Sequence, residues 1–126
     1  MTEMQAAIGL CQLAKLDGWI EARQRNAGIL NAALAPLRAV RLTLPPSNVR
    51  HAYYKYYAFV HPERLARGWT RDRIVGACIA AGVPCGTGSC PEIYREQAFV
   101  GSPSVPLNRL PVSRTLGETR LMLPVV

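Results

Sequence analysis

Lysine and long apolar runs are both scarce in this sequence of 126 residues. Of its 15 basic residues, 13 are arginines, and the only lysines are Lys15 and Lys55. No apolar run reaches the length of about 18 residues that a membrane helix needs, and the first residues lack the pattern of a secretory signal peptide. With 49% hydrophobic and 18% charged residues, the composition is typical of neither a disordered nor a membrane chain. We therefore expect a soluble, cytoplasmic protein.

Metal ligands and catalytic bases are also few. The two histidines, His51 and His61, flank a strand-like segment that separates them by roughly 25 Å when extended. Ser89 and Cys90 follow two glycines in a loop, but no neighbouring residue in the sequence is a base that could activate either side chain. The four cysteines lack the two-residue spacing of a zinc site; they are Cys11, Cys78, Cys85 and Cys90. We predict neither a metal site nor a catalytic residue in this chain.

The charge balance is basic but dispersed. The formal net charge is +7, and the basic residues are spread along the chain without forming a run. Dispersed arginine is usually a solvated surface with ion pairs, which is the reading that we favour. An anionic ligand such as a phosphate or a nucleotide is the alternative.

The first helix is apolar on nearly every side. Thr2 and Gln5 have the spacing of a capping box, which predicts that a helix begins at the second residue. No charged residue occurs between Met4 and Ala14. Because a helix that is apolar all round is buried within something larger, we expect this one to pack against further protein. We predict that the isolated chain self-associates through Met4, Ile8 and Cys11.

The remaining pattern predicts a small α+β domain that spans residues 1–126. The long N-terminal helix is expected to reach about residue 16, to kink at Gly18 and to continue to residue 34. Thr70 and Gly82 mark the two ends of another helix. The other expected elements are strands at 40–44, 53–60, 83–87 and 119–123, and a short helix at 111–117. This order favours an antiparallel or mixed sheet of three to four strands covered by helices.

An aromatic strand carries four of the five tyrosines. Alternation predicts that Tyr53, Tyr57 and Phe59 share one face, together with Lys55. This arrangement leaves open a stand-alone ferredoxin-like module that binds nucleic acid or another anionic ligand, with bases stacked on the aromatic rings. That alternative requires these rings to lie in solvent on one open face, and we consider it the less favoured one.

Several motifs together resemble a known enzyme family. The stretch Met-Thr-Glu-Met-Gln-Ala-Ala-Ile-Gly-Leu at residues 1–10 is similar to a helix of the DegT/DnrJ/StrS-type sugar aminotransferases. Further similarities are His51 before an aromatic strand, the helix that begins at Arg71, and Leu-Pro-Val-Ser-Arg at residues 110–114 before a final Leu-Pro. The resemblance covers essentially the whole chain, and its Gln-Ala-Ala-x-Gly element is the most specific part.

The resemblance implies the small C-terminal domain of a fold type I enzyme that uses pyridoxal phosphate (PLP). Such enzymes transfer an amino group, usually from glutamate, to a keto sugar nucleotide in surface polysaccharide or deoxyaminosugar biosynthesis. Their cofactor is held by a Schiff-base lysine that lies upstream of the Gln-Ala-Ala helix. Neither Lys15 nor Lys55 stands in that context. The resemblance therefore implies that this chain binds no PLP stably, is inactive alone, and requires a large domain or second subunit as its partner.

The same resemblance points to a substrate-side segment. Many family members carry a His-Tyr-Pro-like sequence where this chain has Gly-Ser-Cys-Pro at residues 88–91. The residues carried over as substrate-binding candidates are Ser89, Cys90, Glu92 and Tyr94. Glu92 and Glu96 are four residues apart and are expected to share one helix face.

Overall fold

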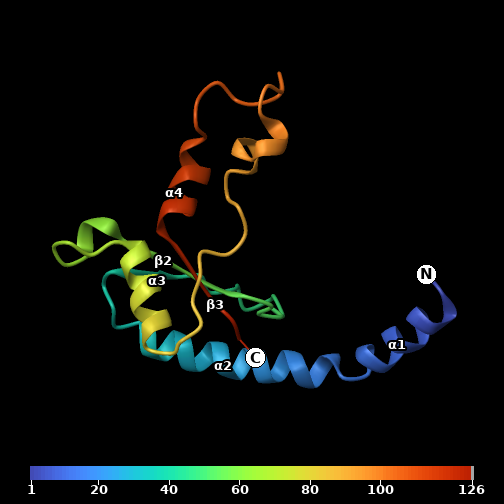
Figure 1. Ribbon diagram of the computed structural model, residues 1–126. Coiled ribbons are helices and arrows are strands. Elements are labelled where there is room, and N and C mark those ends of the chain that lie inside the picture. The colour runs from blue at the N-terminus through green and yellow to red at the C-terminus, as the bar shows by residue number, and fades with distance from the viewer. Residues whose placement is uncertain (126) are drawn as a thin grey trace.

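The computed structural model describes residues 1–125 and has an α+β architecture, as the sequence predicts. The described residues form four α-helices and one small sheet, and Figure 1 shows that α2, α3 and α4 lie beside the sheet. The helices are α1 (Glu3–Leu13), α2 (Leu16–Leu34), α3 (Arg71–Ala80) and α4 (Pro111–Thr119). The strands are β1 (Val40–Leu42), β2 (Tyr56–Val60) and β3 (Arg120–Leu123), and short 3-10 turns lie at η1 (Pro62–Arg64), η2 (Ile93–Arg95) and η3 (Gln97–Phe99).

The sheet is antiparallel, with β2 between β1 and β3. Val40 pairs with Val60, and Tyr56 pairs with Leu123. Along β2 the side chains at 56, 58 and 60 are buried, whereas those at 57 and 59 are half-buried. This alternation follows from the two-residue period of a strand and gives the sheet one core face and one partly open face.

The core lies between the first face of the sheet and α2. Ala27 of α2 is fully buried against Tyr56 and Ala58, and leucines of α2, β1 and β3 surround them. Tyr56 is 1% exposed, and its hydroxyl donates a hydrogen bond of 2.7 Å to the Asn31 side chain on α2. Because this bond satisfies the one polar atom of the ring, the aromatic residue is buried without an unpaired hydroxyl.

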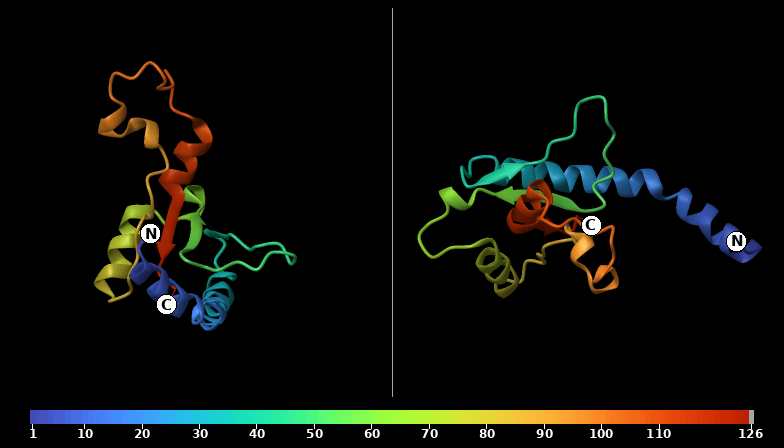
Figure 2. Two further views of the ribbon diagram at one scale, coloured as in Figure 1. Left: turned by 90° about the vertical axis from the view of Figure 1, so that its right-hand side faces the viewer. Right: turned by 90° about the horizontal axis from the view of Figure 1, so that it is seen from above.

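Helix α1 has no buried residue and points away from the rest of the structure (Figures 1 and 2). Its capping box is confirmed: the Gln5 amide donates to Thr2 Oγ1 at 3.3 Å, and the Thr2 amide donates to Gln5 Oε1 at 2.9 Å. Met4 is 75% exposed, and Ile8, Leu10 and Leu13 are exposed as well. The helix is therefore formed by local chemistry, while its apolar surface is left uncovered.

The break between the first two helices is not at the predicted position. The structure interrupts the helix at Ala14 and Lys15, whereas Gly18 lies inside α2 with open space around it. The flexibility of a glycine predicted the kink, but an isolated glycine is tolerated within a helix, so its presence alone does not place a break.

The predicted strand at 83–87 is wrong beyond a single bridge between Gly86 and Met122. Pro84 has no amide hydrogen to give to a ladder, and Gly88 turns the chain away with φ +73°. The aromatic strand is also shorter than predicted, because Tyr53 has φ +45° and lies outside β2. The 92–99 segment forms two 3-10 turns separated at Glu96, so Glu92 and Glu96 do not share a helix face.

Both ends of α3 follow the predicted signals. Thr70 Oγ1 accepts a hydrogen bond of 3.2 Å from the Arg73 amide at the start of the helix. At the other end, Gly82 has φ +77° and the Val83 amide donates to the Cys78 carbonyl at 2.9 Å, which is the Schellman arrangement. In the part of the chain that the structure describes, no helix is long and apolar enough to cross a membrane.

Candidate functional site

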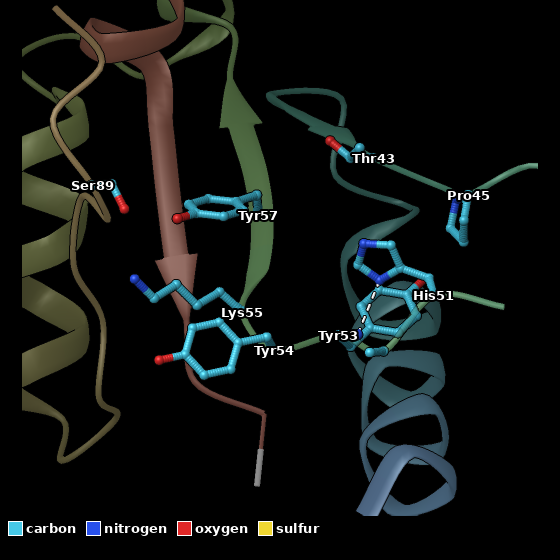
Figure 3. A pocket seen from close by; sticks show the side chains of 9 residues that line it. Thr43, Pro45, His51, Tyr53, Tyr54, Lys55, Tyr57 and Ser89 are labelled. Carbon is cyan, nitrogen blue, oxygen red and sulfur yellow. Dashed lines mark hydrogen bonds between the residues drawn. The ribbon is translucent and has the colours of Figure 1, made fainter. Parts of the chain in front are cut away.

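A cavity of about 440 Å³ lies beside β2. The loop between β1 and β2 supplies most of its wall, β2 adds Tyr57, and the segment after α3 adds Ser89. Figure 3 shows Tyr54, Lys55 and Tyr57 extending toward the segment that carries Ser89, while His51 and Tyr53 lie on the side of α2. Segments far apart in the sequence therefore meet at this pocket.

The α2 side of the pocket is a fixed aromatic wall. The His51 and Tyr53 rings meet edge to face, with centroids 4.4 Å apart, and the Tyr53 amide donates to His51 Nδ1 at 3.1 Å. The Tyr53 ring in turn stacks on Tyr56 of the core at 6.2 Å. Gln24 of α2 donates to the His51 carbonyl at 3.0 Å. Because Nδ1 is an acceptor, the neutral His51 ring carries its proton on Nε2.

The opposite side carries the polar and cationic groups. Lys55 Nζ lies 5.6 Å from the centroid of the Tyr54 ring, within the range of a cation–π interaction. Tyr54 itself is 75% exposed. Ser89 is exposed at the edge of the cavity. An ammonium, hydroxyls and aromatic faces around one hollow favour a polar, anionic ligand that also has a flat or apolar part.

Glu92 and Tyr94, two of the predicted site residues, form an ion-pair cluster with the residues before α4. Glu92 is 8% exposed, and its carboxylate accepts from the Tyr94 hydroxyl at 2.6 Å and from Arg109 Nε at 2.9 Å. Arg109 Nη2 donates to the second oxygen, and Arg95 lies 3.5 Å from it. The Leu110 amide donates to the Tyr94 hydroxyl at 3.0 Å. The cluster therefore fixes η2 against the start of α4.

The charges of this cluster shift its ionisation. Hydrogen bonds from Arg109 and then Tyr94 lower the pKa of Glu92 to about 2. Burial, followed by the Glu92 carboxylate, raises the pKa of Tyr94. Glu92 is therefore ionised at neutral pH and has both oxygens engaged, so it is not poised to accept a proton.

Cys90, the remaining predicted site residue, is exposed next to Ser89. A hydrogen bond with the Glu96 side chain, and secondarily burial, raises the pKa of its thiol. Burial also raises the pKa of Cys85, which lines an apolar cavity of about 580 Å³ together with Cys78. Because the thiolate is the reactive form of cysteine, neither thiol is an activated nucleophile.

The sequence prediction did not include most of the residues that line the pocket. Of the predicted substrate-binding residues, only Ser89 lines this pocket, whereas Tyr53, Lys55 and Tyr57 were predicted only as part of the alternative nucleic-acid platform. The signal that could have found them is the dense aromatic segment with a lysine inside it. Alternation placed Tyr53 on a strand face, but its positive φ moves its ring onto the core.

The nucleic-acid platform of the alternative hypothesis is not formed. Tyr53 is 8% exposed, Tyr57 is half-buried beneath Gly88, and the Arg41 guanidinium covers the Phe59 ring at 4.3 Å. Stacking of bases needs free ring faces on one open surface. Among residues 1–125, no group of three histidine, cysteine or acidic side chains is arranged to hold a metal ion.

The fold is that of part of an aminotransferase. The chain is similar to the aminotransferase from Psychrobacter cryohalolentis, with 41% identity and a TM-score of 0.92; the match covers 99% of this chain and 34% of that one. An aminotransferase of the DegT DnrJ EryC1 StrS type from Brucella abortus is 30% identical with a TM-score of 0.74, over 96% of this chain and 30% of that one.

The family model of the DegT/DnrJ/EryC1/StrS aminotransferases matches residues 1–126, and the chain belongs to this family. At 18% identity, the fold is also that of GDP-4-keto-6-deoxy-D-mannose-3-dehydratase from E. coli, whose structure holds bound hydrated PLP; the TM-score is 0.78, over 98% of this chain and 31% of that one. The chain spans about a third of the length of these solved structures. No curated protein matches it.

The residues described here do not form a PLP site by themselves. The pocket has one ammonium, Lys55, but no aspartate or glutamate lines it to pair with the pyridine nitrogen. The two aspartates of the chain are engaged elsewhere: Asp17 pairs with Arg50 at 2.8 Å, and Asp72 pairs with Arg71 at 2.6 Å. Lys15 is exposed at the junction of α1 and α2.

Proposed function

We propose that residues 1–126 act as the C-terminal small domain of a PLP-dependent sugar aminotransferase. The enzyme transfers an amino group from an amino acid, glutamate in the usual case, to a keto sugar nucleotide in surface polysaccharide or deoxyaminosugar biosynthesis. The observation that carries this proposal is the 41% identity to a solved aminotransferase over 99% of the chain. The Schiff-base lysine and the acidic partner of the cofactor come from protein outside these residues, so the chain alone is inactive.

The role of this domain is to provide one wall of the substrate site. Lys55 and the aromatic rings suit a sugar nucleotide, because the ammonium attracts phosphate and the rings pack against a flat base or sugar face. Ser89 and Cys90 lie on the substrate side of the 86–91 segment. Glu92 and Tyr94 position that segment through their ion-pair cluster with Arg109.

The partner surface in this proposal is α1. Its exposed residues Met4, Ile8 and Cys11 belong to a helix in which nothing is buried. Apolar exposure of this kind is typical of surfaces that another protein covers. We infer that α1 packs against the large domain or against a second subunit.

The test compares the chain alone with a chimera. In the chimera, these residues replace the matching third of the Psychrobacter cryohalolentis aminotransferase. We expect the chimera to show the absorption band of a lysine-bound PLP and to turn over glutamate with a keto sugar nucleotide. The isolated chain should do neither, and Lys15→Met and Lys55→Met should leave its spectrum with PLP unchanged.

Two outcomes would overturn the proposal. Reproducible turnover by the isolated chain would show that it carries its own catalytic lysine, and loss of that turnover in Lys55→Met would identify the lysine. A chimera that binds PLP normally but transaminates no sugar nucleotide would contradict the proposal that this domain forms one wall of the substrate site.

A further inference from the structure

Arg120 connects β3 to the segment that carries Ser89. Its Nε donates to the Thr87 carbonyl and its Nη2 donates to the Ser89 carbonyl. Its guanidinium carbon also lies 5.5 Å from the centroid of the Tyr57 ring. One planar side chain therefore holds two carbonyls of the loop and contacts a ring that lines the pocket.

Backbone hydrogen bonds and close packing hold the same segment on either side of the Arg120 contacts. Gly86 and Met122 exchange backbone hydrogen bonds of 2.9 and 2.8 Å. Gly88 lies so close to Tyr57 that an added Cβ would be 2.7 Å from the ring. Gly117 of α4 packs against Pro91 so closely that a Cβ there would be 2.5 Å from the proline ring. Between these points, Arg120 supplies donors to the backbone at 87 and 89.

The sequence of this loop explains why such a clamp matters. With Gly86 and Gly88 on both sides of Thr87, the free segment has wide backbone freedom. Ser89 stands at the cavity edge and is exposed, so its own side chain does not pack it in place. Charge-assisted hydrogen bonds from a guanidinium are stronger and more directional than those between neutral groups.

We propose that Arg120 is a positioning residue that fixes the backbone of residues 87–89 and thereby holds Ser89 at the substrate side of the pocket. The part of this inference that concerns substrate rests on the proposed function. Arg120 does not line the pocket itself and acts through the loop that it binds.

Hydrogen exchange on the full chain tests the positioning role without PLP or turnover. The readout is the Gly86 amide, which donates to the Met122 carbonyl at the point where this segment meets β3. In Arg120→Met, we expect its exchange to rise about tenfold, as for the loss of a hydrogen bond to a charged group. Arg120→Lys keeps the charge and one donating group, so the exchange rate in this variant should lie between those of the wild type and of Arg120→Met. Arg114→Met is the matched control, because Arg114 bonds Glu118 on the surface of α4 and not the loop.

The outcomes decide the inference in either direction. Exchange in Arg120→Met that stays at the wild-type rate, or that rises equally in Arg114→Met, would overturn it. If Arg120→Met does not fold, Arg120→Lys decides alone. Faster exchange of the Gly86 amide with unchanged exchange in β2 supports the inference, and unchanged exchange of that amide refutes it.

The chimera tests the consequence for substrate. There, Arg120→Met should raise KM for the sugar nucleotide while kcat and the PLP absorption stay unchanged, because only binding by this wall is lost. A fall in kcat at constant KM would contradict the inference that Arg120 affects substrate binding by positioning Ser89. If the parent chimera is inactive, the proposed function fails, and hydrogen exchange still decides whether Arg120 fixes the loop.

Discussion

Replacing Gly88 by alanine tests the packing that places the Ser89 loop on the sheet. Gly88 has φ +73°, a conformation that costs an L-residue about 1–2 kcal/mol. The new Cβ would also lie 2.7 Å from Tyr57 Cε1 and 2.8 Å from its hydroxyl oxygen, so the ring or the loop must move. Overpacking of this kind costs about 1–3 kcal/mol. Together these terms predict a loss of about 2–5 kcal/mol in the free energy of unfolding.

Gly82→Ala is the matched control for the backbone part of this cost. Gly82 has nearly the same φ, +77°, but no atom lies within 4 Å of where its Cβ would be. Its substitution should therefore cost about 1–2 kcal/mol, the backbone term alone. Urea unfolding of both variants, with the slope m checked for constancy, measures the difference between the two free energies.

A double-mutant cycle assigns the rest of the cost to Tyr57. When Tyr57→Ala removes the ring, Gly88→Ala should cost no more than Gly82→Ala does in the wild type. The reasoning is refuted if Gly88→Ala and Gly82→Ala are equally destabilising in the wild type. It is also refuted if the cost of Gly88→Ala is the same with and without the Tyr57 ring.

Two further predictions concern acid stability and association. The pKa of Glu92 in the folded protein is about 2, below its ordinary value of 4.5. Ionised Glu92 therefore stabilises the folded state above about pH 4.5, and this stabilisation is lost as the pH falls toward 2. The difference in unfolding free energy between wild type and Glu92→Gln should shrink over that range; a pH-independent difference would contradict this. The isolated chain should self-associate with rising concentration in light scattering, and Ile8→Glu should weaken that association; a monomeric wild-type chain at high concentration would contradict it.

Local signals in the sequence predicted the helix ends well. The capping pair Thr2 and Gln5, the N-cap Thr70 and the terminal Gly82 each act through atoms a few residues away. The two-residue period of β2 was also predicted, although the burial of the face that carries Tyr56, Ala58 and Val60 was not. Such features depend on the backbone and its nearest side chains, so they can be read without knowing the fold.

Specific side-chain contacts, some of them between distant residues, set what the sequence left open. Pattern alone extended the aromatic strand back to Tyr53, yet stacking on Tyr56 and the bond to His51 accompany a turn there. Similarly, Glu92 looked like one carboxylate on a helix, but Arg109, 17 residues away, engages it in an ion pair. No local period encodes either partner.

The sequence by itself determined the α+β class, most helix ends, and the family to which the chain belongs, because caps, periodicity and motif residues are local properties. Only the tertiary structure brought Ser89 to the pocket that His51, Lys55 and Tyr57 line. The hydrogen bond from Arg120 to the Ser89 carbonyl is part of that tertiary structure. Ser89 is more than 30 positions away from each of those three pocket residues, so their meeting depends on how β2, β3 and the loop pack in space. A pocket is a property of that packing, which no single segment of the sequence contains.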